Sequence, residues 1–284
     1  QDRVEDEDIL ITRAKDADIL IITNLPLSRR VIEACPDLKM ISVGFTGVDH
    51  IDLAACRERN ILVSNSSGYA TQAVAELVFA MIIDLLRNIK PCDEATRNAG
   101  TGAGLLGNEL AGKVLGIVGV GQIGMRVAKI AGAFGCKILG YATRERKEAL
   151  DLGVQYVSLE ELMKESDIVS LHVPLLESTR NMINRDLISL MKPSAILINT
   201  ARGAVVDNQA LAEALNEGKI AGAGIDVYEM EPPIPGDHPL LNAKNTILTP
   251  HIAFATVESF QKRAAIVFAN IEKYLAGEPQ NVIE

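Results

Sequence analysis

The sequence predicts an α/β protein made of two doubly wound domains with parallel sheets. Short β-rich, apolar runs alternate with amphipathic stretches through most of the 284 residues, a pattern typical of parallel strands covered by helices. The glycine motif Gly119-Val120-Gly121-Gln122-Ile123-Gly124 stands between one such run and a helical stretch. The length suits one large domain or two ordinary ones.

Composition and charge exclude several classes of protein. Lysine and arginine total 28 against 37 acidic residues, a net charge of −9, and without a basic stripe nucleic acid is not an expected partner. The longest apolar stretch, Val74 to Leu86, is shorter than the ~18–20 residues of a membrane span, so no membrane contact is expected. The acidic N-terminus is unlike a secretory signal. The four cysteines lack metal-ligand spacing, which indicates a cytoplasmic protein with reduced thiols and no metal site.

The N-terminal part of the chain predicts a first unit of strands and helices. Its expected strands are Asp18–Thr23, Lys39–Gly44 and Ile61–Ser64, with a helix at Leu25–Cys35. Between Thr71 and Ile89 apolar residues recur at helical spacing in a wide stripe, so we expect a helix buried between two units. Pro91 and the stretch Asn98–Gly107 indicate a boundary. The cluster Gly100–Gly104 is expected to be a loop, because no strand precedes it.

A second unit begins at Lys113. Its expected strands are Lys113–Gly119, Lys137–Ala142, Val154–Val157, Asp167–Val173, Ala195–Thr200, Gly222–Val227 and Thr246–Thr249. Helices fit between these strands. Ser158 and Glu161 form a capping-box pair before one helix, and Asp207 caps another that Gly218 ends.

The last helical pattern, Val257–Leu275, is expected to pack on the first unit. We therefore expect one domain formed by residues 1–89 and 255–284, and a second formed by residues 90–254.

The glycine motif has the context that dinucleotide binding requires. It directly follows the expected strand Val114–Val118 and opens the apolar helical run Val127–Phe134. Gly119, Gly121 and Gly124 permit a tight turn, so the backbone amides of the turn, including those of Gln122 and Ile123, can approach a pyrophosphate. The alternative is a glycine-rich turn that only packs tightly.

The end of the next strand bears on the choice of cofactor. NAD-binding folds usually place an acid there, ~20 residues past the glycines, to hold the ribose 2′-hydroxyl. Here the position is Ala142, and Thr143, Arg144 and Arg146 follow it. These side chains could hold a 2′-phosphate, which favours NADP over NAD. Alternatively, Glu145 or Glu148 could bind the hydroxyl and leave the arginines solvated.

Three polar residues follow strand ends in the second unit. Arg202 comes after one strand, and a guanidinium there can pair with a substrate carboxylate through two parallel hydrogen bonds. His251, one of four histidines, follows the last strand, and histidine titrates in the range suited to passing a proton at neutral pH. A carboxylate beside the imidazole would favour its protonated form. From the residues alone, Glu229 and Glu231 are near-equal candidates for that carboxylate.

Asp226 also ends a strand of the second unit. It could bind the carboxamide of a nicotinamide, or it could be an aspartate that only caps a turn.

The order of these motifs resembles the D-isomer-specific 2-hydroxyacid dehydrogenase family from about Ala17 onward. The matching segments are Phe45–Asp52, Gly68–Thr71, Val74–Glu76, the glycine motif, Asn199–Gly203, Asp226–Tyr228, Glu231-Pro232 and Thr249–His251. Within the family, Gly68–Thr71 and Pro250–Thr256 are most similar to the glycerate dehydrogenase and hydroxypyruvate or glyoxylate reductase branch.

The resemblance implies a Rossmann-type cofactor domain, a flavodoxin-like substrate domain and a homodimer. It implies reversible hydride transfer between a nicotinamide and a small 2-keto acid that gives a D-2-hydroxy acid. Arg202 would bind the carboxylate, His251 would donate the proton and Glu231, rather than Glu229, would hold His251 protonated. The implied substrate contacts are the backbone amides of Thr46 and Gly47. The implied cofactor contacts, besides the glycine motif, Asp226 and His251, are Thr71, Val173, Pro174, Thr200 and Ala201.

Two departures from the family pattern carry expectations. The family usually begins with a strand and a helix before the position of Asp16, so we expect that an N-terminal segment is missing from this sequence. Relatives often carry a tryptophan in the loop from Arg97 to Gly107, where this chain has none. We therefore expect the arm that joins the two subunits of a dimer to pack differently from the arm of those relatives.

Other functions are possible on the same fold. A dinucleotide-sensing scaffold or corepressor is the main alternative, although such a protein has no evident need for the Arg, Glu and His set. Phosphoglycerate dehydrogenase and the oxidation of formate or phosphite are enzymatic alternatives.

Overall fold

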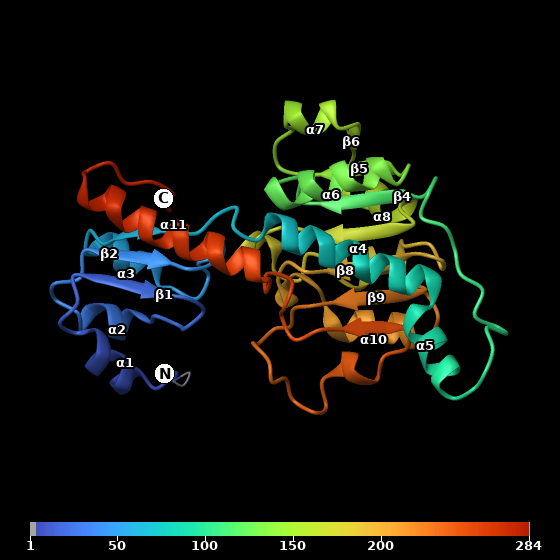
Figure 1. The fold of residues 1–284 in the computed structure, drawn as a ribbon, viewed down its shortest axis with the longest axis horizontal. Coiled ribbons are helices and arrows are strands. Elements are labelled where there is room, and N and C mark those ends of the chain that lie inside the picture. The colour runs from blue at the N-terminus through green and yellow to red at the C-terminus, as the bar shows by residue number, and fades with distance from the viewer. Residues whose placement is uncertain (1–3, 284) are drawn as a thin grey trace. The chain divides into compact units, whose positions relative to one another are not determined.

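The computed structural model describes residues 4–283 and divides the chain into two compact units. Unit 1 comprises Gln1–Ala70 and Ala255–Glu284, and unit 2 comprises Thr71–Phe254. Each unit contains a sheet whose strands all run parallel (Figure 1). The predicted α/β class with parallel sheets is therefore confirmed. No helix within residues 4–283 is long and apolar enough to cross a membrane.

Unit 1 is a small sheet with helices connecting its strands. Its strands β1 (Ile19–Ile22), β2 (Met40–Val43) and β3 (Leu62–Ser64) pair in the order β1-β2-β3. Its helices are α1 (Glu7–Ala14), α2 (Arg29–Glu33), α3 (Leu53–Glu58) and α11 (Val257–Leu275). All three strands lie within the segments that the sequence predicts.

Helix α11 packs on unit 1, as the sequence predicts. The Ser42 hydroxyl on β2 donates to the Val267 carbonyl at 3.1 Å. The Asn270 amide donates to the Asn65 carbonyl at 2.9 Å, and both Asn270 and Ser42 are fully buried. These two bonds join the C-terminal helix to the sheet through groups that water cannot reach.

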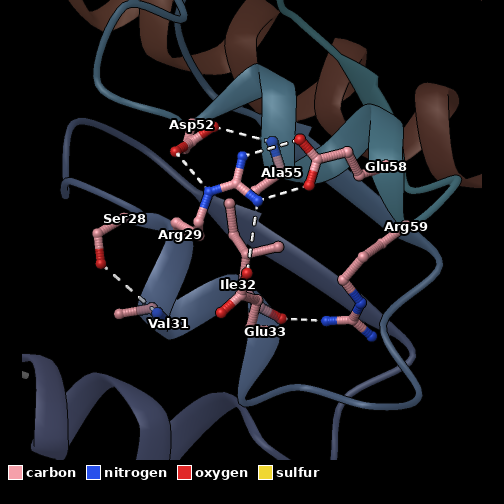
Figure 2. Close-up of polar contacts among 9 residues, drawn as sticks. All are labelled: Ser28, Arg29, Val31, Ile32, Glu33, Asp52, Ala55, Glu58 and Arg59. Carbon is pink, nitrogen blue, oxygen red and sulfur yellow. Dashed lines mark hydrogen bonds and ion pairs between the residues drawn. The ribbon is translucent and has the colours of Figure 1, made fainter.

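Helices α2 and α3 are joined by the Arg29 guanidinium (Figure 2). Arg29 donates to both carboxylate oxygens of Glu58, at 2.6 and 3.0 Å. Ser28 and Asp52 cap the two helices by accepting from the amides of Val31 and Ala55. Paired in this fork geometry, the guanidinium fixes how the short helices lie against each other.

Unit 2 is a seven-stranded parallel sheet in the order β10-β9-β8-β7-β4-β5-β6. The strands are β4 (Val114–Val118), β5 (Lys137–Tyr141), β6 (Val154–Tyr156), β7 (Ile168–Leu171), β8 (Ile196–Asn199), β9 (Gly222–Ile225) and β10 (Thr246–Leu248). The order reverses at β4 and β7, and such switch points are where open α/β sheets bind ligands.

Helices and short 3₁₀ turns lie before and between the strands of unit 2. They are α4 (Thr71–Arg87), α5 (Ile89–Arg97), α6 (Gln122–Ala133), α7 (Lys147–Asp151), α8 (Leu159–Glu165), α9 (Arg185–Ser189), α10 (Asn208–Asn216), and the turns η1 (Glu177–Thr179), η2 (Gly203–Val205) and η3 (Pro239–Asn242). Both predicted N-caps are present, because Ser158 accepts from the Glu161 amide and Asp207 accepts from the Ala210 amide. Among the described residues the Glu161 side chain returns no bond to the Ser158 amide, so only half of the predicted capping box forms.

The division between the units differs from the predicted boundary at residue 89. Helix α4 belongs to unit 2, because its buried residues Val78, Met81 and Ile82 join the core of that unit. The predicted helix Thr71–Ile89 ends at Arg87, where Asn88 takes a left-handed φ of 51°. Pro91 lies in the first turn of α5 rather than at a boundary, a position where its missing amide costs no helical hydrogen bond.

Candidate active site

The glycine motif forms the turn from β4 to α6. Gly119 has a φ of 99°, and a Cβ there would lie 2.7 Å from the His172 carbonyl. A Cβ on Gly124 would lie 2.2 Å from the Gly119 oxygen, whereas one on Gly121 would meet nothing within 4 Å. The first and third glycines therefore allow tight packing, and the second leaves open space above the turn. This is the arrangement that a pyrophosphate requires.

The N-terminus of α6 fits an anion. Its N-cap is Gly121, and no side chain caps the helix there. The first amides of a helix have no partner within the helix, and the helix dipole favours negative charge at this end. The open space at Gly121 lies at the same end, so these residues fit the phosphates of a dinucleotide.

The residues after β5 lie where the sequence places them. Strand β5 ends at Tyr141, Ala142 follows, and Thr143, Arg144 and Arg146 are exposed. Within residues 4–283, neither Arg144 nor Arg146 forms an ion pair with another side chain. Both guanidiniums are therefore available to an anion, and binding of a 2′-phosphate by them stays a prediction.

The other predicted cofactor residues lie at element ends in unit 2. Thr71 is the first residue of α4, Val173 and Pro174 follow β7, and Thr200 and Ala201 follow β8. The buried Thr200 hydroxyl makes no hydrogen bond to the described residues. An unsatisfied buried hydroxyl is unusual, and here it offers a hydrogen bond to a bound group.

His251 and Glu231 form a direct pair. The Nδ1 atom of His251 lies 3.0 and 2.9 Å from the two carboxylate oxygens of Glu231. The His251 side chain is 17 % exposed and that of Glu231 is 40 % exposed. Because Nδ1 faces the carboxylate, Nε2 is the nitrogen left to exchange a proton with a substrate.

Arg202 lies at the end of the neighbouring strand. In the parallel register Asn199 of β8 pairs with Ile225 of β9, which pairs with Leu248 of β10. Arg202 and His251 each follow their strand by three residues, so both leave the carboxyl edge of the sheet. The Asn199 side chain accepts from the Ala201 amide and donates to the Arg202 carbonyl, both at 3.0 Å. These bonds fix the backbone that carries Arg202.

Asp226 anchors the segment that contains His251. One carboxylate oxygen accepts from the Thr249 hydroxyl at 2.6 Å and the Ile252 amide at 2.8 Å, and the other accepts from the Ala253 amide at 2.8 Å. Burial raises the pKa of Asp226, and these hydrogen bonds oppose that rise. His251 itself has a left-handed φ of 57°, a conformation that this clamp supports.

A second histidine–carboxylate pair was not predicted from the sequence. The buried His238 places Nε2 2.9 Å from a carboxylate oxygen of Glu229. The two glutamates that the sequence leaves as near-equal candidates thus pair with different histidines. The signal was present in Asp237-His238-Pro239, a histidine beside a turn-forming proline, but nothing in the sequence assigns it a partner.

The predicted substrate contacts in unit 1 lie in the loop after β2. Thr46 is exposed, and its carbonyl accepts from the Asn65 side chain at 2.7 Å. The amides of Thr46 and Gly47 donate no hydrogen bond within the described residues. Two such amides can bind a carboxylate.

Known proteins resemble this chain over nearly its whole length. Residues 79–253 match the family model described as D-isomer specific 2-hydroxyacid dehydrogenase, NAD binding domain. A glyoxylate reductase of Korarchaeum cryptofilum is 42 % identical over 97 % of this chain and 85 % of its own length. A hydroxypyruvate reductase of Blautia hydrogenotrophica is 36 % identical over 98 % of this chain and 88 % of its own length.

Solved structures show the same fold. An acyclic imino acid reductase in complex with NADPH and D-Arg superposes with a TM-score of 0.92 at 38 % identity, covering 98 % of this chain and 89 % of that one. A D-lactate dehydrogenase from Aquifex aeolicus, complexed with NAD and lactic acid, gives a TM-score of 0.88 at 36 % identity, covering 94 % and 86 %.

Proposed function

Because the chain belongs to the D-isomer specific 2-hydroxyacid dehydrogenase family, we propose that it reduces glyoxylate, hydroxypyruvate or a related small 2-keto acid. Members of this family, including this chain, are hydroxyacid oxidoreductases that use a nicotinamide cofactor. The product is the D-2-hydroxy acid. The observation that carries this proposal is the pairing of His251 with Glu231 at the sheet edge that also carries Arg202. The proposed substrate class is that of the similar glyoxylate and hydroxypyruvate reductases.

Each residue of the site has one task in the reaction. A nicotinamide cofactor held at the glycine turn would, when bound, supply a hydride to the 2-carbon of the keto acid. Arg202 binds the carboxylate through two hydrogen bonds and polarises the keto oxygen. His251 gives the proton on Nε2 to that oxygen as negative charge develops on it. Glu231 accepts from Nδ1 and favours the protonated imidazole. The amides of Thr46 and Gly47 bind the carboxylate as well.

Replacing His251 by asparagine tests this assignment. An asparagine at this position cannot act as a general acid, so kcat for keto-acid reduction should fall ~10²-fold or more. The measurement is NAD(P)H consumption with glyoxylate, hydroxypyruvate, pyruvate and longer 2-keto acids. Near-normal turnover by the variant would contradict the role of His251. If the native protein consumed no NAD(P)H with any of these acids, the result would instead favour a dinucleotide-sensing scaffold or corepressor.

We propose that the cofactor is NADP rather than NAD. Ala142 stands where an acid would bind the ribose hydroxyl, and the exposed Arg144 and Arg146 follow it without ion pairs to the described residues. An arginine at this place can accept the 2′-phosphate. Of the two structural relatives above, one binds NADPH and the other NAD, so the proposal rests on Ala142 and the two arginines.

We propose that the protein is a homodimer. Helix α5 buries none of its residues, and Ile89 and Leu106 are 49 % and 92 % exposed. A hollow of about 500 Å³ lies beside this helix and is lined by residues such as Pro91, Leu106 and Ile247. Exposed apolar groups around a hollow are typical of a protein interface. Light scattering after size-exclusion chromatography measures the mass, and a monomer at working concentrations would refute the proposal.

A further inference from the structure

The Glu229–His238 pair lies in the same segment as the glutamate of the active site. Glu229 precedes Glu231 by two residues, and its carboxylate lies 2.9 Å from Nε2 of His238. The His238 side chain is 5 % exposed, compared with 40 % for Glu229. A buried imidazole therefore holds the segment immediately before Glu231.

Both ring nitrogens of His238 have partners. The Leu240 amide donates to Nδ1 at 3.3 Å, so Nδ1 is the acceptor and the ring proton lies on Nε2. That proton is donated to Glu229. Burial raises the pKa of the Glu229 carboxyl, but the hydrogen bond from His238 outweighs that effect together with other hydrogen bonds, so the pKa lies below its ordinary value. The ring orientation is thus fixed from both sides.

Tyr228 connects the Glu229–His238 pair to the segments that carry Arg202 and His251. Its ring meets the His238 ring edge-on, with 5.5 Å between centroids. Its hydroxyl donates to the Thr249 carbonyl at 3.3 Å, two residues before His251. Its backbone lies against Gly203, the neighbour of Arg202. The segment from Tyr228 to Glu231 therefore touches the backbone that carries Arg202 and the backbone that carries His251.

We propose that Glu229 and His238 are positioning residues that hold Glu231 against His251. This inference rests on the proposed function, because it assigns a role within that same site. Glu231 projects from an exposed segment. If the backbone nearby were not held in place, its carboxylate would sample other orientations and kcat would fall. The bond from the buried His238 to Glu229 holds this backbone in place. The imidazole of His238 acts only through the backbone and does not touch the substrate.

Two variants of Glu229 separate positioning from charge. Glu229→Ala removes the acceptor for His238, and we expect kcat to fall ~10-fold, the scale of a misplaced catalytic group, with the KM for the cofactor unchanged within a factor of about two. Glu229→Gln keeps an oxygen that accepts from Nε2 and should retain most of kcat. In Glu229→Ala the alkaline limb of the pH profile for reduction should move to lower pH, because a less closely held Glu231 favours the protonated imidazole less.

A double-mutant cycle gives the sharpest readout. If Glu229 acts through Glu231, then Glu229→Ala should change kcat by less than about twofold in a Glu231→Ala background. His238→Ala removes the same bond from the other side and carries the same expectation, so the test stands if either variant folds. Glu213→Ala, which removes the ion pair between Glu213 on α10 and Arg185 on α9, is the matched control and should leave kcat unchanged.

The outcomes are distinct. Equal losses of kcat from Glu229→Ala with and without Glu231 would overturn the inference, as would an unchanged pH profile. A fall in melting temperature with normal kcat in the folded variant would show a role in stability alone, and would also overturn it. Failure of the proposed function has a different signature, namely a native protein that reduces no keto acid.

Discussion

Gly203 is the residue at which the backbone carrying Arg202 meets the backbone before Glu231. A Cβ at this position would lie 1.9 Å from the carbonyl carbon of Tyr228 and 2.1 Å from its oxygen. Backbone atoms on both sides must move to admit even a methyl group. Gly203→Ala should therefore lower the free energy of unfolding by ~1–3 kcal/mol, the usual cost of overpacking, and should also lower kcat by displacing Tyr228. Denaturant unfolding and steady-state rates check both effects.

Gly132→Ala is the control for this substitution. Gly132 lies within α6, and a Cβ there would meet nothing within 4 Å. Alanine is favoured over glycine inside a helix by ~0.5–1 kcal/mol, so this variant should be slightly more stable and fully active. A Gly203→Ala protein as stable as the native chain would show that the two segments are free to separate.

The sequence predicts the residues at strand ends better than it predicts pairs between loops. The positions of Arg202, Asp226 and His251 follow from where β8, β9 and β10 end, and strand ends are readable from apolar runs. The partner of Glu229 depends on the path of residues 232–238, which have no periodicity. For that reason the residues alone left Glu229 and Glu231 near-equal, and the resemblance was needed to choose Glu231.

At the scale of elements, β5 and the residues after it determine the ribose site. The sequence predicts the end of this strand to within one residue, because alternating apolar residues stop there and charged ones follow. Ala142→Asp would place a carboxylate where it can accept from a ribose hydroxyl and would repel a 2′-phosphate. We expect the ratio of kcat/KM for NADPH to that for NADH to fall at least ~10-fold, about the value of one charged hydrogen bond.

Rates with both cofactors measure this ratio directly. Arg144→Ala should lower the rate with NADPH and leave the rate with NADH nearly unchanged. A native protein that prefers NADH would contradict the NADP proposal, and Glu145 or Glu148 would then be the residue to replace. Lys137→Ala, at the exposed start of the same strand, serves as the control.

Helix ends were harder to predict than helix presence. The apolar stripe from Thr71 to Ile89 predicts a helix, but the break at Asn88 leaves no mark in the pattern, since α5 continues with residues that also suit a helix. A left-handed asparagine is a common way to end a helix. The clear caps Ser158 and Asp207 were predicted correctly because each has a side chain that suits an N-cap.

At the scale of the whole molecule, the sequence predicts two units and the return of the C-terminal helix to the first. It misplaces α4, because a wide apolar stripe shows that a helix is buried but not which core buries it. Contacts of α4 with α6, β8 and β9 place it in unit 2. The seven-strand order also lies beyond sequence periodicity, since every strand of a buried parallel sheet has a similar apolar pattern.

The stability of the whole chain should depend on the protonation of His172. This residue follows β7, and its Nε2 lies 2.9 Å from the Ser170 hydroxyl. Burial lowers the pKa of His172 from 6.5 to about 4. The unfolded chain then binds a proton between pH 6.5 and about 4 that the folded chain does not bind, so stability is fully present above pH 6.5 and falls as the pH falls through this window. The loss is on the order of 3 kcal/mol at the acid end of this window, since each pKa unit corresponds to about 1.36 kcal/mol.

His172→Gln removes the titration while retaining a polar group of similar size. The free energy of unfolding, measured in denaturant from pH 7 to pH 4, should fall less steeply for this variant than for the native protein. Buried Asp226 has a raised pKa and acts in the opposite direction, but it is present in both proteins, so its effect cancels in the difference between the two curves. Parallel curves would mean that the folded protein protonates His172 as readily as the unfolded chain does, and that the ring is not shielded from water.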